Sequence, residues 1–115
     1  MTKKVYFGFA LADSMFAGDC TIRRTSLSIN EVKSIIEQGV ESCCNPSHLA
    51  SIDAMRTRFG IGVPIPEVPP KVVVGAGDSI LVMGIRGLPR LTDRHEYTSE
   101  EVASATFSFN LYTVL

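Results

Sequence analysis

Two groups of residues carry side chains that could act on a phosphate. The first is the pair Ser47 and His48, which directly follows Asn45 and Pro46. Asn is a preferred N-cap and Pro suits the first helical position, so the pair is predicted to lie in the first turn of a helix. Free N–H groups and the positive end of the helix dipole make such a turn an anion-binding position. An imidazole beside it suggests phosphate chemistry.

The second group lies in the polar segment from Arg86 to Tyr97, directly after an apolar run. Catalytic groups are often carried by loops that a rigid scaffold holds. An arginine can bind a phosphate through two hydrogen bonds and stabilise charge that develops on it, and a histidine can protonate a leaving oxygen near neutral pH. The charged residues of this segment are Arg86, Arg90, Asp93, Arg94, His95 and Glu96.

Both groups also have simpler explanations. A histidine at a helix start is often only tolerated there, and a charged loop is often a solvated surface. The cysteines are interpreted as core residues, because cysteine packs as a small hydrophobe. Cys43, Cys44, His48 and His95 lack the spacing of a zinc site, so no metal and no cofactor is predicted. The sequence from Gly75 to Gly77 opens no helix, which leaves a dinucleotide-binding loop unsupported.

Three predicted helices would position these groups. Each begins at a capping residue, and the two longer ones end at a glycine. The predicted spans are Ser28 to Gly39, Asn45 to Gly60, and Thr98 to about Ser104. In the second helix the residues at helical spacing predict a core face made of Leu49, Ile52, Met55 and Phe59.

The remaining segments predict strands and two loops. Runs of apolar and β-branched residues indicate strands at 3–11, 20–25 (a short edge strand), 71–75, 79–85 and 106–115, with a short extended link at 40–44. A turn at Gly77 and Asp78 predicts that the third and fourth of these strands form a hairpin. The four prolines between Gly60 and Pro70 predict an extended surface connection.

This order of elements predicts a compact α/β domain, with a mixed sheet of about five strands flanked by about three helices. A length of 115 residues fits one domain with one modest core. The net charge of −1 argues against a broad electrostatic grip on long nucleic acid. No apolar run approaches the ~20 residues of a membrane span. Three cysteines without a secretory signal favour a reduced, cytoplasmic setting.

The order of motifs along nearly the whole chain resembles the viral and bacterial ring-nuclease family, which includes anti-CRISPR enzymes that act on type III systems. Members carry a small residue and a histidine at the start of a second helix, followed by short motifs in a fixed order and spacing. The matching residues here are Ser47-His48, Phe59-Gly60, Val63-Pro64, Gly77-Asp78, Ile80 to Met83, Arg90 to Asp93, Thr98 to Glu101, and Phe107 to Phe109.

The resemblance implies a homodimer that binds cyclic tetra-adenylate on its two-fold axis and cuts it without a metal. In such enzymes the ribose 2′-OH attacks its own phosphodiester and leaves a 2′,3′-cyclic phosphate. By position, His48 would be the general acid, Arg90 would stabilise the phosphorane, and Asp93 would be the supporting acid, one methylene shorter than the usual Glu. Ligand contacts would come from Ser47 and from the residues discussed next.

Two departures from the family pattern lie in the ligand-binding segments. After the first strand, polar side chains appear only at Asp13 and Ser14, and after Val-Pro an acid, Glu67, stands where the family has a base. Arg86 or Lys71 is available to replace that base. These departures keep two alternatives open: a dimer that sequesters a cyclic nucleotide without cutting it, and an interaction protein of a virus or mobile element without a nucleotide ligand.

Overall fold

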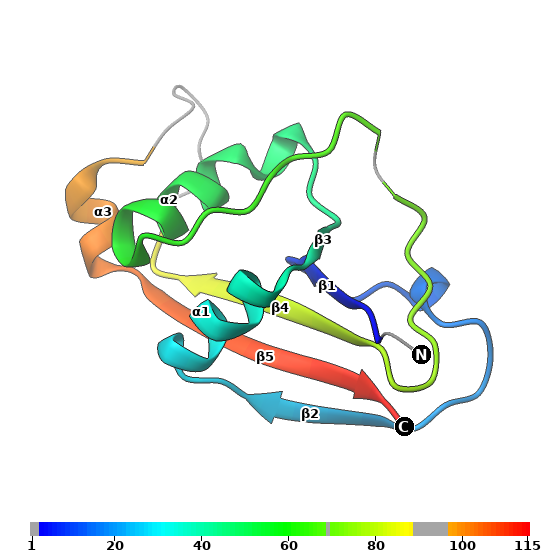
Figure 1. Cartoon of the computed structure of the whole chain (residues 1–115). Coiled ribbons are helices and arrows are strands. Elements are labelled where there is room, and N and C mark those ends of the chain that lie inside the picture. Colours follow the sequence, from blue (N-terminus) through cyan, green and yellow to red (C-terminus); the bar gives the residue numbers. More distant parts are fainter. Residues whose placement is uncertain (1–2, 69, 89–96) are drawn as a thin grey trace.

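Five strands form one mixed sheet at the centre of the fold (Figure 1). The computed structural model describes residues 3–68, 70–88 and 97–115. The strands lie in the order β2-β5-β4-β1-β3, and β1 pairs in parallel with β3 and β4, whereas β5 is antiparallel to β4 and β2. Their bounds are β1 (Val5–Gly8), β2 (Ile22–Ser26), β3 (Glu41–Ser42), β4 (Ser79–Arg86) and β5 (Thr106–Val114).

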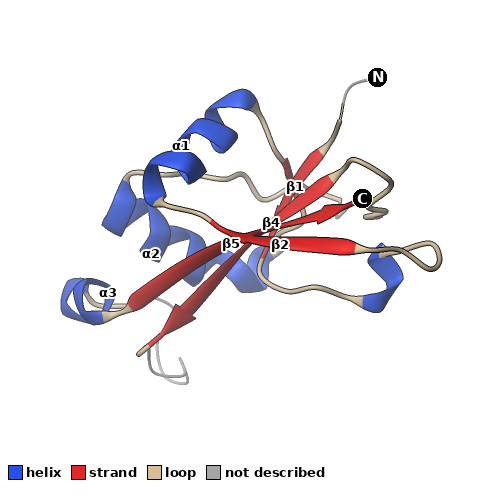
Figure 2. Ribbon diagram, turned by 90° about the horizontal axis from the view of Figure 1, so that it is seen from below, coloured by secondary structure: helices blue, strands red, loops and turns tan. Residues whose placement is uncertain are grey.

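Three α-helices and two short 3₁₀ turns complete the described part of the chain. They are α1 (Ile29–Gln38), α2 (Leu49–Phe59) and α3 (Ser99–Ser104), with η1 (Asp13–Met15) and η2 (Pro46–His48). Figure 2 shows α1 and α2 together on one face of the sheet. The predicted α/β class and mixed sheet are therefore confirmed. None of the described helices is both long and apolar enough to cross a membrane.

The predicted helix ends are confirmed by the capping contacts. The side chain of Ser28 accepts a hydrogen bond from Glu31 N at 3.2 Å, and Glu31 accepts one in return from Ser28 N at 3.0 Å. Thr98 and Glu101 form the same reciprocal pair at the start of α3. Gly60 ends α2 in the left-handed conformation, with φ of 72°, which a residue without Cβ adopts at no steric cost.

The sheet buries side chains on both faces. The face that carries Phe7, Leu81, Met83 and Phe109 packs against Val32 of α1 and against Ile52 and Met55 of α2; we call it the helix-covered face. The opposite face carries Tyr6, Ile80 and Val114, and is covered by Val74 and by Met15 and Phe16 near η1. The alternation of these residues along each strand follows from the period of two in a β-strand.

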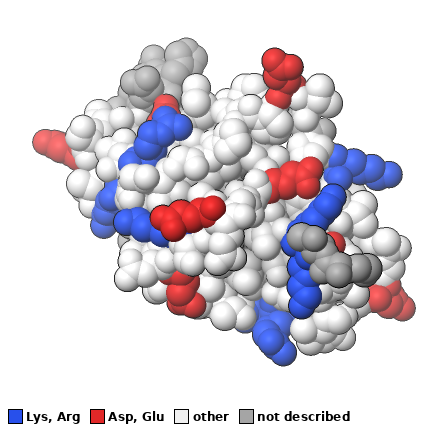
Figure 3. Space-filling view, viewed as in Figure 1, with Lys and Arg blue, Asp and Glu red and all other residues white. Residues whose placement is uncertain are grey.

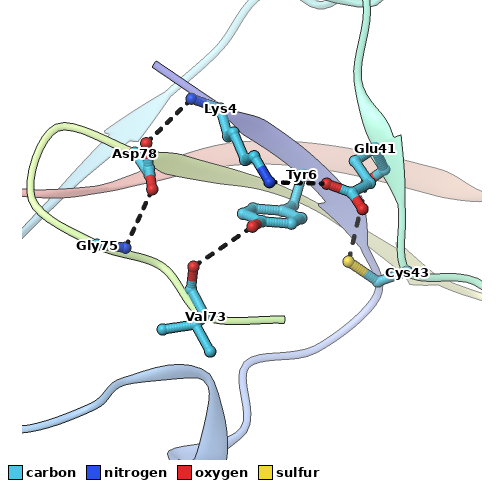
Figure 4. Close-up of polar contacts among 7 residues, drawn as sticks. All are labelled: Lys4, Tyr6, Glu41, Cys43, Val73, Gly75 and Asp78. Carbon is cyan, nitrogen blue, oxygen red and sulfur yellow. Dashed lines mark hydrogen bonds and ion pairs between the residues drawn. The ribbon is translucent and has the colours of Figure 1, made fainter. Parts of the chain in front are cut away.

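The predicted hairpin of residues 71–75 with 79–85 is wrong. Residues 71–75 form no strand, and β4 pairs with β1 and β5 instead. The Asp78 carboxylate accepts hydrogen bonds from Lys4 N at 3.0 Å and Gly75 N at 3.2 Å, and Tyr6 Oη donates to the Val73 carbonyl at 3.4 Å (Figure 4). These contacts lay the segment across the opposite face, where its valines cover the sheet instead of extending it.

Three smaller expectations also differ from the structure. The first strand is shorter than predicted, because β1 ends at Gly8 and Leu11 is exposed. Leu49 has 52% of its surface exposed, so it is not part of the core face of α2. The proline-rich connection is not wholly a surface segment, because Ile61 and Val63 are only 5% and 3% exposed and pack into the helix-covered core.

Replacing Arg58 by methionine is expected to lower the free energy of unfolding by about 1–2 kcal/mol. Nη1 of Arg58 lies 3.0, 2.8 and 3.3 Å from the carbonyl oxygens of Val102, Ala103 and Ala105, at the C-terminal end of α3. Methionine keeps the apolar stem over Phe59 but removes every donor. Urea denaturation measures the loss. Arg56→Met is the control expected to change stability less, because Arg56 is exposed on the same helix and, among the described residues, bonds only to the partly exposed Asp53.

Candidate functional site

His48 is held at the junction of η2 and α2 by contacts with Asn45. The backbone N–H of Asn45 donates to Nδ1 of His48 at 3.1 Å, and Asn45 Oδ1 accepts from the N–H of Ser47 at 2.9 Å. The hydroxyl of Ser47 also donates to Asn45 Oδ1. Asn45 is therefore the predicted N-cap, although the turn that it caps is 3₁₀ before α2 begins at Leu49. Of these bonds, the one from the Asn45 N–H holds the imidazole itself.

The ring of Phe9, just after β1, covers one side of the imidazole. The two ring centroids are 4.7 Å apart at an interplanar angle of 36°. Phe9 in turn contacts the buried Phe7 edge-on at 5.6 Å, so the imidazole is connected to the core. Burial lowers the pKa of His48 below its ordinary value of 6.5.

The hydrogen bond to Nδ1 determines which nitrogen of His48 can donate. Because Nδ1 accepts from the Asn45 N–H, the proton of the neutral ring lies on Nε2. The side chain can therefore offer an Nε2–H group to a bound oxygen, beside the Ser47 hydroxyl at the start of the helix. Such an Nε2–H group can bind a phosphate oxygen; to act as a proton donor, the ring must first be protonated on Nδ1, which replaces the hydrogen bond from the Asn45 N–H.

Acidification from pH 7.5 to 5.5 is expected to destabilise the wild-type protein more than a His48→Gln variant. The pKa of His48 is lowered in the folded state, so below about pH 6.5 the unfolded chain binds the proton first and unfolding is favoured. That loss of stability grows until the pH passes the folded pKa. Thermal unfolding of both proteins across this range measures the difference, and parallel curves would contradict it.

The structure brings together only part of the predicted site. Ser47 and His48 are adjacent, whereas Asp13 and Ser14 lie exposed in η1 and Arg86 lies exposed at the end of β4. Among the described residues, no hydrogen bond or ring contact joins these three to His48. Arg90 and Asp93 lie outside the described residues, so their role stays a prediction. Phe9 is the contact that sequence reasoning did not assign to the site, since an aromatic residue in an apolar run indicates only core.

The cysteines show no sign of a reactive or metal-binding role. Burial raises the pKa of Cys43 to about 11, and it raises the pKa of Cys44 as well, so both thiols stay protonated at neutral pH. All three cysteines are free; Cys44 is buried and Cys43 is partly buried, whereas Cys20 is exposed, so the prediction of a core position is wrong for Cys20. Within residues 3–68, 70–88 and 97–115, no group of three or more His, Cys, Asp or Glu side chains could hold a metal ion.

Charged side chains of both signs alternate over the face shown in Figure 3. Arg56 pairs with Asp53 at 2.9 Å, and Lys4 lies 4.0 Å from Glu41. Such exposed pairs contribute little to stability. Because positive and negative side chains are mixed on this face, an anionic ligand there would depend on a few individual groups.

Comparisons with known proteins define the fold and leave the activity open. No family model and no curated protein matches the chain. Among solved structures, the chain is similar to B116 of Sulfolobus turreted icosahedral virus, with a TM-score of 0.69 and 20% sequence identity over 96% of this chain and 98% of that chain. At this identity the similarity concerns the fold. The chain therefore shares its whole architecture with a protein of a virus.

Proposed function

We propose that this protein is a metal-independent phosphodiesterase that opens a small cyclic oligoadenylate in the cytoplasm and so counters type III CRISPR signalling. The observation that carries the proposal is the orientation of His48 at the start of α2, where Nδ1 is occupied by Asn45 and Nε2 is left to act. Shared architecture with a viral protein agrees with a role in a virus or mobile element.

The reaction is an internal transesterification. A ribose 2′-OH attacks the adjacent phosphorus, the bond from phosphorus to the 5′-oxygen breaks, and the products carry a 2′,3′-cyclic phosphate and a 5′-hydroxyl. The proton that the 2′-OH loses is balanced by the proton that the leaving 5′-oxygen gains. His48 delivers that proton from Nε2 after the ring has also taken a proton on Nδ1, which gives up its bond from the Asn45 N–H. The negative charge of a bound phosphate favours this protonated ring, whereas burial disfavours it.

The remaining groups of the proposed site come from three places. Ser47 would contact the phosphate beside His48, Arg90 would stabilise the phosphorane, and Asp93 would support the reaction. Asp13, Ser14 and Arg86 are proposed ligand contacts. A homodimer would present two copies of this site to a ring with two-fold symmetry, which gives two equivalent bonds to cut. The partners are thus a second copy and a cyclic oligonucleotide, cyclic tetra-adenylate first.

Incubation of the protein with cyclic oligoadenylates in EDTA, read by mass spectrometry, tests the proposal. Linear products that end in a 2′,3′-cyclic phosphate are expected from cyclic tetra-adenylate. Cleavage that EDTA abolishes, or products with a 3′-phosphate formed directly, would contradict the mechanism. A ring that stays whole and does not bind would contradict the ligand.

Sequestration without cleavage is the second candidate function. It is favoured by the finding that, among the described residues, His48 has no carboxylate or arginine within hydrogen-bonding distance. The Nε2–H group of His48 and the Ser47 hydroxyl would then hold a phosphate without activating it. A ring recovered intact after it co-elutes with the protein would support this candidate over catalysis.

A further inference from the structure

A groove of about 540 Å³ lies along β5 at the point where β2 leaves the sheet. β2 pairs with β5 only from Asn110 to Val114, and the last bond between the two segments is from Leu27 N to the Phe109 carbonyl, at 2.9 Å. From Leu27 the chain turns into α1. The first residues of β5 therefore form an edge of the sheet. His48 does not line the groove beside this edge, although Arg86, proposed above as a ligand contact, does.

The backbone of Phe107 faces this groove. Hydrogen-bonding groups of successive residues in a strand point to alternate sides. Val114 uses its N–H and C=O on the β4 side, through bonds with Asp78 and Gly77, whereas Phe109 and Leu115 bond on the β2 side. By this alternation the N–H and C=O of Phe107 point to the side where β2 has ended. Within the described part of the chain, no backbone hydrogen bond across this edge reaches Phe107.

The two walls of the groove differ in chemistry. On the helix-covered side it is lined by Leu27, Ile29, Phe59 and Phe107, which are apolar. On the other side it is lined by polar groups, and the charged ones are Arg24 and Arg86; both are exposed. No Asp or Glu lines the groove, and neither arginine forms an ion pair with a described carboxylate.

The side chain of Arg24, which lines this wall, is held in place by Tyr112. Its Nε donates to Tyr112 Oη at 3.1 Å, and its guanidinium carbon lies 6.0 Å from the centre of the same ring. The other two guanidinium nitrogens are left for a ligand. Arg86 reaches the same wall from β4, where it pairs with Thr106. Two unpaired positive charges therefore border an unpaired backbone edge.

We propose that this groove binds an extended peptide segment of another protein, in which acidic and apolar residues alternate, as a short added strand beside Phe107. Addition of a strand to a free sheet edge is a recurring mode of peptide recognition. Side chains of a strand point to alternate faces, so one set would meet the apolar wall and the other set would meet Arg24 and Arg86. The groove has the volume of a ligand pocket and suits only a short segment.

The test uses the full chain and a fluorescein-labelled hexapeptide of alternating glutamate and valine with blocked ends. Fluorescence anisotropy is expected to show saturable binding, and Arg24→Glu is expected to weaken it at least tenfold. Arg23→Glu is the matched control, because Arg23 pairs with Thr113, does not line the groove and changes the net charge equally; it is expected to stay within twofold. Hydrogen exchange of the Phe107 amide is expected to slow at least tenfold on binding.

Five results would overturn the proposal. Equal weakening by Arg23→Glu and Arg24→Glu would show unspecific attraction, and unchanged exchange at Phe107 would exclude an added strand. Equal binding of a lysine-valine hexapeptide would exclude recognition of acids. If a labelled oligothymidine bound more tightly with the same dependence on Arg24, the groove would belong to a nucleic acid. If sedimentation showed that Arg24→Glu separates two copies, the groove would be an interface between copies of this chain. None of these outcomes depends on cleavage of a cyclic nucleotide.

Discussion

Replacing His48 by alanine is expected to reduce cleavage of cyclic tetra-adenylate by about 10²–10⁴-fold, which is the usual contribution of a positioned general acid. The variant loses the only imidazole that the structure places at the start of α2, with Nδ1 fixed by the Asn45 N–H. Substrate binding should change much less, because the Ser47 hydroxyl and the other proposed ligand contacts remain. Single-turnover cleavage followed by mass spectrometry gives the rate, and a thermal shift with the intact ring gives binding.

Two further variants separate proton transfer from local structure. His48→Gln keeps a neutral hydrogen-bond donor, so it is expected to bind the ring and to remain as inactive as His48→Ala. Gln38→Ala, at the exposed end of α1, should cleave at the wild-type rate. Since the acid must be protonated, wild-type cleavage should fall as the pH rises through the pKa of His48 in the complex. Full activity of His48→Gln would remove His48 from the acid role.

Local signals in the sequence predicted the helices well because those signals act within a few residues. The capping boxes at Ser28 and Thr98 and the glycine at the end of α2 depend only on neighbouring hydrogen bonds. The N-cap role of Asn45 was predicted for the same reason. A short edge strand at 20–25 was also predicted, from an imperfect alternation of residue types, and β2 lies at that edge with all five of its residues exposed.

The hairpin prediction failed because a remote contact decides the path of residues 71–75. Valine-rich residues before a turn satisfy every local criterion for a strand. Asp78 binds the backbone of Lys4, 74 residues earlier in the chain, and this bond aligns β4 with β1. The valine segment then lies over the opposite face and does not pair with β4. The residue types within the segment do not determine this path.

The candidate site was predicted in part for a similar reason. Ser47 and His48 were identified because capping residues precede them directly. The contact of the Phe9 ring with His48 joins the segment after β1 to the start of α2. The two residues are far apart in the sequence, so no local pattern predicts this contact. The groove beside β5 depends on where β2 stops pairing, which a pattern of residue types does not specify.

Truncation of Met55 to alanine is expected to lower the free energy of unfolding by about 2–5 kcal/mol, the range for buried large-to-small substitutions. Met55 is fully buried between α2 and the sheet, among Phe7, Leu81 and Phe109. For a domain with a total stability of about 5–15 kcal/mol, this loss is a large share of the whole. Urea denaturation at constant pH measures it.

Leu49→Ala on the same helix is the control. It tests whether burial, and not position in the apolar stripe alone, determines how much stability a substitution costs. Both residues belong to the apolar stripe that the sequence predicts, yet 52% of Leu49 is exposed and none of Met55 is. If burial determines the energetic contribution, Leu49→Ala should change stability by no more than about 0.5 kcal/mol. Comparable losses at the two positions would mean that Leu49 is covered in solution, so the first turn of α2 would then lie in an interface beside His48.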